Sequence, residues 1–158
     1  MYGSRSGISP VMATVILVAI AIVIAIAVAF WATGLVGIFT RFEKIETLAT
    51  AYDSNNNQVE LLVRNTGSSP ATIDNIYVNG QPISALGGGF GFTNDGVVLD
   101  PPTNAPTCDT NSGLCDPGEY VVIQVSEGGT FTWQPGVTYE VAVHTASGRL
   151  YPVSVLIP

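Results

Sequence analysis

Residues 8–39 read ISPVMATVILVAIAIVIAIAVAFWATGLVGIF, and this stretch decides the fold because no charged side chain lies between Arg5 and Arg41. A bilayer core needs about 20 apolar residues in helical form, whereas this stretch would form a helix on the order of 48 Å long. A secretory signal peptide has a shorter apolar region that ends in a small-residue cleavage site. Here the run continues into Arg41 and Phe42, so an ordinary cleaved signal peptide is disfavoured.

The start of this helix is well specified. Ser9 can cap free backbone N–H groups, and Pro10 suits the first helical turn because its missing N–H would have had no partner there. We therefore expect a short leader at residues 1–7, an apolar helix at residues 8–45 and a separate head at residues 46–158.

Small residues recur at every fourth position along the helix, which would let a second helix approach closely even in lipid. Successive members of this row turn by about 40° around the helix axis, so the row could meet several neighbours. The alternatives are that alanine is common in any apolar helix and that Phe30 and Trp31 mark a membrane interface. The predicted packing residues are Ala21, Ala25, Ala29, Thr33 and Gly37.

The remaining residues are typical of an all-β domain. Short β-rich runs at 45–53, 58–65, 71–84, 120–126, 137–145 and 150–157 alternate with turn signals, of which Asn79-Gly80 and Ser147-Gly148 are the clearest. We also expect brief strands at 96–100 and 130–133, and loops at 87–91 and 100–119. The predicted class is α+β: one long N-terminal hydrophobic helix followed by an immunoglobulin-like antiparallel β-sandwich.

Charge is distributed unevenly along the chain. All 12 acidic residues lie at Glu43 or later, and from Glu46 onward 11 acids face only Arg64 and Arg149. A head this acidic would repel phosphate backbones, so we expect no nucleic-acid partner.

Cys108 and Cys115 enclose a short polar loop. We expect a disulfide between them, because the remaining features place the head outside the cytoplasm. Two free thiols are the alternative. A metal site is disfavoured because the only histidine, His144, is remote in sequence and no CxxC spacing occurs.

No residue pattern predicts catalysis or a cofactor. One histidine makes no convincing triad without a nucleophile motif, and neither G-x-S-x-G nor H-E-x-x-H occurs. His144 reads as a strand residue near the surface. The loop residues Asp109, Asn111, Asp116 and Glu119 could crowd around a cation, but their spacing misses the EF-hand pattern. We therefore expect no enzyme activity, no metal and no cofactor.

The N-terminus resembles that of archaeal type IV pilins. The resemblance rests on Gly7-Ile8-Ser9-Pro10-Val11, preceded by Arg5 and followed at once by the apolar helix. Residues 60–80 and 116–125 also resemble strands of the immunoglobulin-like sandwiches of archaeal pilins and archaellins. Two departures are Ser6, which separates Arg5 from Gly7, and Met12, which stands where bacterial pilins usually have glutamate.

The resemblance implies a role and a set of partners. A prepilin peptidase would cut between Gly7 and Ile8, with Arg5 supplying the leader's charge. An assembly ATPase and a membrane platform protein would then move the subunit from the cytoplasmic membrane into an extracellular homopolymeric filament. The alternatives are an archaellum filament subunit and a membrane-anchored extracellular binding module that never polymerises.

Overall fold

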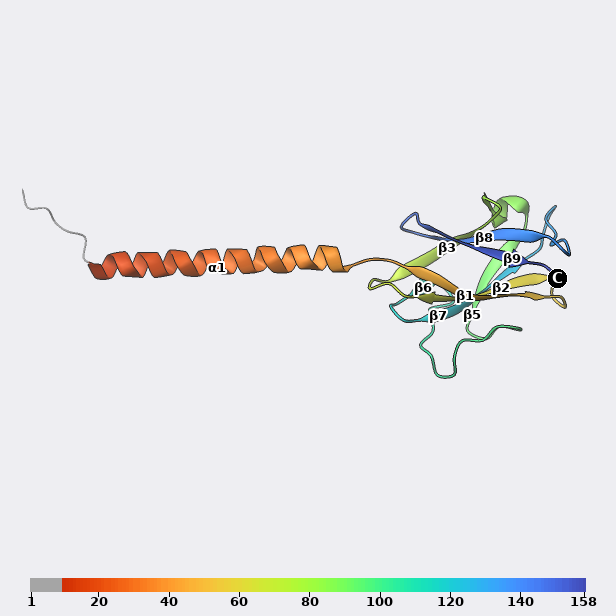
Figure 1. The fold of residues 1–158 in the computed structure, drawn as a ribbon, viewed down its shortest axis with the longest axis horizontal. Helices are drawn as coiled ribbons and strands as arrows, with labels where there is room; N and C mark the ends of the chain where they lie inside the picture. The colour runs from red at the N-terminus through yellow and green to blue at the C-terminus, as the bar shows by residue number, and fades with distance from the viewer. Residues whose placement is uncertain (1–9) are drawn as a thin grey trace, which may run out of the picture. The chain divides into compact units, whose positions relative to one another are not determined.

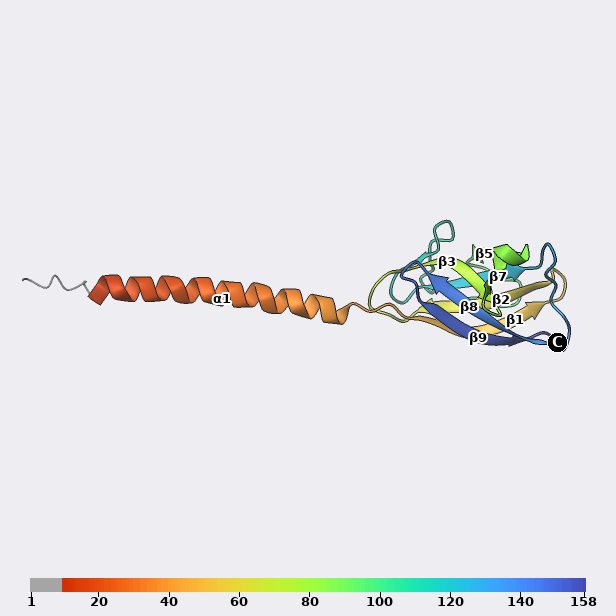
Figure 2. The same cartoon turned by 90° about the horizontal axis from the view of Figure 1, so that it is seen from above.

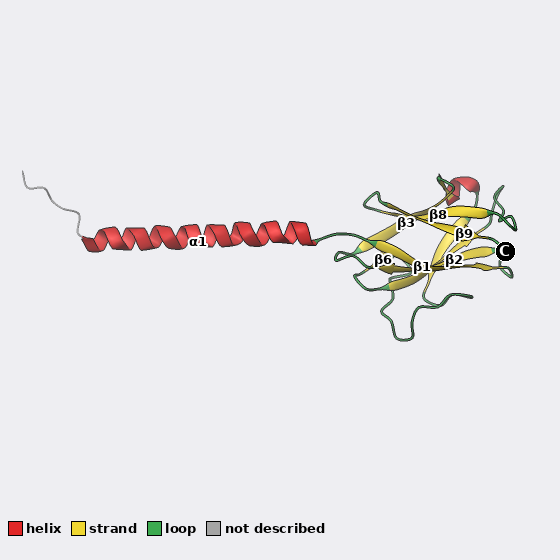
Figure 3. Cartoon of the chain, viewed as in Figure 1, coloured by secondary structure: helices red, strands yellow, loops and turns green. Residues whose placement is uncertain are grey.

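The computed structural model describes residues 10–158, with the side chains of residues 35, 36 and 38–40 left undescribed. The chain divides after Arg41 into two compact units. The first contains the helix α1 (Pro10–Thr40), and the second, from Phe42 to Pro158, contains every strand of the described residues. Figure 1 labels these elements, and Figure 3 separates helix, strand and loop by colour.

The helix α1 has 31 residues and begins at Pro10, as the first-turn preference of proline predicts. The two threonine hydroxyl groups that the structure describes in α1 need no outside partner. Thr14 Oγ1 donates to the carbonyl of Val11 at 2.8 Å, and Thr33 Oγ1 donates to that of Ala29 at 2.9 Å. Such bonds let threonine sit in an apolar helix at little cost.

The helix ends at Thr40, short of the expected limit at residue 45. The reason is local competition for the backbone. The carbonyls of Phe42, Glu43 and Lys44 accept hydrogen bonds from the head, so these three residues join the head before the first strand begins at Ile45.

The head consists of two antiparallel sheets (Figure 1), which confirms the α+β class with a sandwich-like arrangement. The first sheet has the strand order β1-β2-β7-β5, with bounds Ile45–Asp53, Gln58–Asn65, Tyr120–Ser126 and Gly89–Thr93. The second has the order β4-β3-β8-β9, with bounds Gln81–Pro82, Ala71–Val78, Thr138–Thr145 and Leu150–Leu156. A two-residue strand, β6 (Leu114–Cys115), pairs with the start of β3, and the 3-10 helix η1 (Ile83–Leu86) follows β4. Seen from above, β8 and β9 lie in front of β7 and β2 (Figure 2).

The core lies between the sheets and consists of aliphatic side chains at alternate strand positions. One bulge in β3, between Ile73 and Asn75, restores the inward direction at Ile76. The fully buried aliphatic residues that the central strands contribute to this core include Val59, Leu61, Val63, Ile76, Val121, Ile123, Val125, Val141 and Val143.

Most of the expected strands occur where the alternation predicted them, and the Asn79-Gly80 hairpin is confirmed. Val78 pairs with Gln81 across the turn, and Asn79 and Gly80 have φ values of 49° and 79°, as a two-residue hairpin turn requires. Ser147-Gly148 likewise joins β8 to β9, with φ 83° at Gly148.

Three local predictions were wrong. Residues 96–100 form no strand, because the N–H groups of Val97, Val98 and Leu99 bind the Glu60 carboxylate instead of a neighbouring strand. Residues 130–133 form only an isolated bridge between Gly128 and Phe131. Conversely, the glycine-rich segment expected as a loop contains β5, which pairs with β7.

Candidate assembly interface

The described side chains of α1 are exposed in the single chain. Fourteen large apolar residues of the helix, from Val11 to Trp31, have at least half of their surface accessible. They are distributed around the whole helix and not along one stripe. A helix that is apolar on every side is buried in a membrane or in the core of a larger structure. Within the described residues, Pro10–Gly34 is long and apolar enough to cross a bilayer.

All five residues of the predicted small-residue row lie on the exposed surface of α1. The Thr33 hydroxyl donates to the backbone at Ala29 and Phe30, so it presents its methyl group and backbone to a neighbour at no hydrogen-bonding cost. A Cβ atom added at Gly34 or Gly37 would meet nothing within 4 Å. Packing within this chain therefore does not require glycine at these two positions.

The two glycines help to form a shallow notch on the first unit. Its volume is about 490 Å³, and Thr33, Gly34, Gly37 and Arg41 line it. Because Thr33, Gly34 and Gly37 have small side chains, another helix can approach this surface closely. The positively charged Arg41 lies at one end of the notch.

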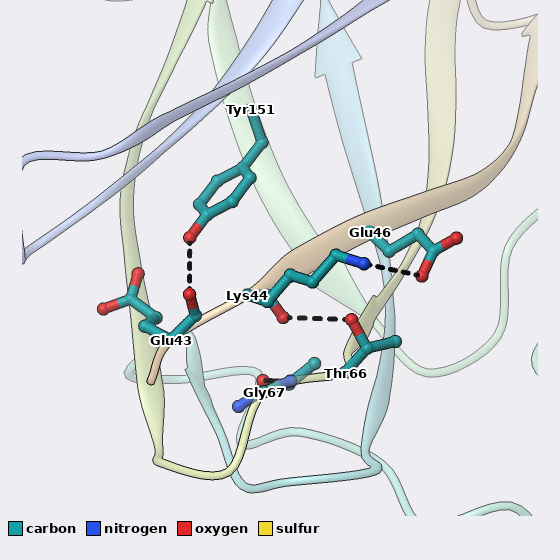
Figure 4. A network of polar contacts seen from close by, with 7 residues as sticks. Glu43, Lys44, Glu46, Thr66, Gly67 and Tyr151 are labelled. Atoms are coloured by element: carbon teal, nitrogen blue, oxygen red, sulfur yellow. Dashed lines mark hydrogen bonds and ion pairs between the residues drawn. The ribbon is translucent and has the colours of Figure 1, made fainter. Parts of the chain in front are cut away.

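The head begins with a clamped segment, residues 42–44 (Figure 4). Thr66 N and Gly67 N donate to the carbonyl of Lys44 at 2.9 and 3.1 Å. Ser68 N and Ser69 N donate to the carbonyl of Phe42 at 2.9 and 3.2 Å. The turn after β2 thus satisfies two of the three carbonyls of the segment.

Strand β9 and the loop before it satisfy the third. Tyr151 OH and Arg149 Nη1 each donate to the carbonyl of Glu43 at 3.2 Å. The exposed pair Lys44 and Glu46, 4.0 Å apart, adds little to this arrangement. Sequence alone gave no signal for the clamp, because its partners lie 22 to 108 positions away along the chain.

Gly67 makes the clamp sterically possible. A Cβ atom at this position would lie 2.6 Å from both the Lys44 nitrogen and the Phe42 carbonyl oxygen. The buried side chain of Asn65 stabilises the same turn. Its Oδ1 atom accepts the N–H of Gly67, and its Nδ2 atom donates to the carbonyls of Ser69 and Cys115.

Cys108 and Cys115 form a disulfide in the structure, and both are buried. The loop between them is ordered by Asp109, whose carboxylate accepts bonds from Asn111 N and Ser112 Oγ. The Ser112 hydroxyl and the Asn111 N–H lower the pKa of Asp109. Glu119 accepts the Asp116 N–H in the next turn. The carboxylates of Asp109 and Glu119 therefore accept hydrogen bonds within their own turns. Among residues 10–158, no group of three His, Cys, Asp or Glu side chains could hold a metal ion.

Glu60 is a buried charged residue that the sequence analysis did not single out. It lies on β2, fully buried on the face opposite the core, and its carboxylate accepts the N–H groups of Val97, Val98 and Leu99 at 2.7–2.9 Å. Gln124 Nε2 donates to it at 3.0 Å. Burial would raise the pKa of Glu60, but these hydrogen bonds outweigh it and lower the pKa. All its bonds are internal, so Glu60 holds a loop and offers no free site.

His144 lies on β8, as expected, with its side chain about one quarter exposed. Its Nδ1 atom contacts the Asp74 carboxylate across the sheet, and its ring lies 5.5 Å from that of Tyr77. With no nucleophile in this group, it is a polar contact between side chains near the surface. The expected processing residues Arg5, Gly7 and Ile8, and the capping residue Ser9, lie outside the described residues.

No protein-family model matches this chain, and no curated protein matches it either. Two solved structures resemble it at a distance. The archaellum periplasmic stator protein FlaG from Sulfolobus acidocaldarius is 14% identical with a TM-score of 0.42, covering 72% of this chain and 100% of that chain. The Iho670 flagellar-like filament is 14% identical with a TM-score of 0.36, covering 94% of this chain and 98% of that chain. Likeness at this level carries no argument about function.

Proposed function

We propose that this chain is a structural subunit, a major pilin, of an extracellular archaeal type IV pilus that serves adhesion to surfaces or cells. It polymerises through α1 and has no catalytic role. The observation that supports the proposal is the uncharged 31-residue helix whose apolar side chains are exposed on all sides.

The size of that apolar surface decides where the helix can reside. Burying one large apolar side chain contributes about 1.5–3 kcal/mol. Fourteen such side chains are at least half exposed. A helix left in water would therefore lack some tens of kcal/mol of favourable burial free energy. A whole domain is stable by only about 5–15 kcal/mol. The helix must therefore be covered by lipid or by protein at every stage.

A pilin can bury its helix first in lipid and then in protein. The precursor waits in the cytoplasmic membrane with α1 in lipid. The subunit then transfers α1 into a bundle of identical helices, which buries the same surface. The row from Ala21 to Gly37 lets the helices pack closely where lipid supplies no hydrophobic drive. At about 46 Å, α1 is also longer than the roughly 30 Å bilayer core requires.

The resemblance of residues 6–31 to archaeal pilin N-termini supplies the remaining steps of the proposal. A prepilin peptidase removes residues 1–7 between Gly7 and Ile8, and an assembly ATPase with a membrane platform protein extrudes the subunit. Met12 carries no carboxylate, so assembly does not use an ion pair between this residue and a neighbour's amino terminus.

The processing step is tested by the intact mass and N-terminal sequence of the native protein. We expect a start at Ile8 and a mass two hydrogens below that of the reduced chain. A native start at Met1 would contradict the processing account.

Polymerisation is tested by the double variant Ala25→Leu and Ala29→Leu, which fills the small-residue row. We expect filaments to be lost in electron micrographs while membrane insertion is unchanged. The matched control is Ala19→Leu with Ala27→Leu, which adds the same bulk at positions outside the row. Normal filaments from the first variant, or equal loss from both, would refute the packing role of the row.

Two alternatives have distinct outcomes. A membrane-anchored binding module that never polymerises is favoured by the span Pro10–Gly34, which alone suffices to cross a bilayer; purified filaments would exclude it. An archaellum filament subunit would give a swimming defect on deletion, with attachment intact.

A further inference from the structure

A cleft of about 360 Å³ opens at one end of the head. It lies where β3 ends, whereas the clamped segment 42–44 is bound beside the start of β3, through Ser68 and Ser69. The length of β3 separates the two by about 23 Å. Within the head, the cleft is thus at the end opposite the one where the chain enters. The lining residues used below are Asn79, Gln81, Thr130, Phe131, Thr132 and Tyr139.

The apolar lining of the cleft comprises Val78, Leu86 and an aromatic surface formed by Phe131 and the largely buried Tyr139. Buried Trp133 packs against both rings. The three rings are edge-to-face, with centroids 4.6 Å apart for Phe131 and Trp133, 5.0 Å for Trp133 and Tyr139, and 6.0 Å for Phe131 and Tyr139. Because each ring is held by the other two, this surface is formed before a ligand arrives, which reduces the entropy lost on binding.

The polar part of the cleft consists of neutral amide and hydroxyl groups. Asn79 Oδ1 accepts the N–H of Glu140 at 3.0 Å, which leaves its amide hydrogens to donate to a ligand. Thr132 Oγ1 accepts a bond from Gln134 Nε2 at 2.9 Å, which leaves its hydroxyl hydrogen to donate. Gln81 and Thr130 are exposed at the rim.

No residue lining the cleft is charged. An anionic ligand would find no counter-charge here and would be repelled by a head that carries a large excess of acids over Arg64 and Arg149. A cationic ligand would find no carboxylate in the lining. Neutral donors and acceptors beside a fixed aromatic surface match a neutral polyol ring, which has apolar C–H faces and hydroxyl groups at its edge.

We propose that this cleft binds neutral carbohydrate, such as a hexose unit of a surface glycan. Its volume is near the lower end of the range for small-molecule sites, about 300–1,000 Å³, and so accommodates one or two sugar rings. The inference rests on the adhesive part of the proposed function and is independent of polymerisation.

The test uses the full chain in a detergent whose head group is not a sugar. The chain has two tryptophans, so Trp31→Phe leaves Trp133, beside the cleft, as the only fluorophore of its kind. Titration with glucose, galactose, mannose and N-acetylglucosamine should give a saturable fluorescence change for at least one of them. The expected dissociation constant is on the order of 1 mM for a ligand of this size. Glucuronate at matched ionic strength should bind more weakly than the best neutral sugar.

Two variants connect the binding to the cleft. Thr132→Val and Gln81→Ala each remove one hydrogen-bonding group and should weaken binding about fivefold. Thr103→Val is the matched control, because Thr103 is exposed in a loop that does not line the cleft; its binding should be unchanged. Near-ultraviolet circular dichroism checks that each variant keeps its fold.

Absence of saturable binding by all four neutral sugars would overturn the proposal, as would tighter binding of glucuronate or equal binding by all three variants. Filaments of the chain without cleft substitutions are examined separately by electron microscopy. If that chain forms normal filaments but binds none of the neutral sugars, this inference is wrong and the polymerisation proposal stands; if it binds sugar but forms no filaments, the polymerisation proposal is wrong.

Discussion

Replacing Glu60 by glutamine removes one buried charge without changing the size of the side chain. In the wild type, Oε1 accepts the N–H of Val97, and Oε2 accepts those of Val98 and Leu99. An amide has only one acceptor oxygen, so in either orientation its NH₂ group faces at least one of these partly buried N–H donors. A buried donor without an acceptor costs about 1–3 kcal/mol, and the remaining bonds lose their charge assistance.

The expected loss in free energy of unfolding for Glu60→Gln is therefore about 3 kcal/mol. We would measure it by urea denaturation of the full chain in micelles, followed by the near-ultraviolet signal of the aromatic residues. Glu140→Gln is the matched control, because Glu140 is exposed and should change stability by no more than about 0.5 kcal/mol. If the two variants were equally stable, the buried carboxylate would not hold the loop and the reasoning would be refuted.

The same variant predicts a dependence on pH. The pKa of Glu60 is lowered in the folded protein, so its stabilising effect is complete above its unfolded value of about 4.3 and is lost as the pH falls through the folded value. The stability difference between wild type and Glu60→Gln should be constant near neutral pH and should shrink below about pH 4. A constant difference down to pH 2 would contradict the assignment.

Three further changes test the head. Gly67→Ala should cost about 2–3 kcal/mol, because its Cβ would meet backbone atoms at 2.6 Å, whereas Gly91→Ala, with nothing within 4 Å, should be nearly neutral in the same denaturation assay. Tyr151→Phe removes one hydrogen bond to the clamped segment and should cost about 1 kcal/mol; no change would show that the bond is not formed in solution. Reduction of the bond between Cys108 and Cys115 should lower the free energy of unfolding by about 2.5 kcal/mol, and an unchanged urea midpoint with dithiothreitol would contradict this.

Local signals in the sequence predicted much of the fold. Pro10 marks the helix start, alternation marks β2 and β7, and Asn79-Gly80 marks a hairpin, because each depends only on neighbouring residues. The strand β5 was missed for the converse reason. Glycine-rich GFGFT has weak intrinsic strand preference, but β7 offers it a free edge, and Phe90 and Phe92 pack against the core.

Contacts between residues far apart in the chain could not be predicted from the sequence. Alternation on β2 would turn Glu60 toward solvent, and nothing near it indicates that a loop 37 to 39 positions later covers the carboxylate. The sugar-sized cleft likewise depends on β3, η1 and the segment before β8 meeting at one end of the head. The need to bury α1, in contrast, could be predicted from its apolar composition alone, because the head of the same chain leaves its described side chains exposed.

The clamped segment has a mechanical consequence. A chain pulled from its helix, as a subunit of the proposed filament would be, transmits the load through its backbone, and the load enters the head at Phe42. The carbonyls of Phe42 and Lys44 are held by the turn that leads from β2 to β3, and that of Glu43 by Arg149 and Tyr151 beside and on β9. Pulling therefore loads the hydrogen bonds of this segment ahead of the pairing between β1 and β2, which begins at Ile45. Rupture of the head should begin with this group of bonds and not with the peeling of β1 alone.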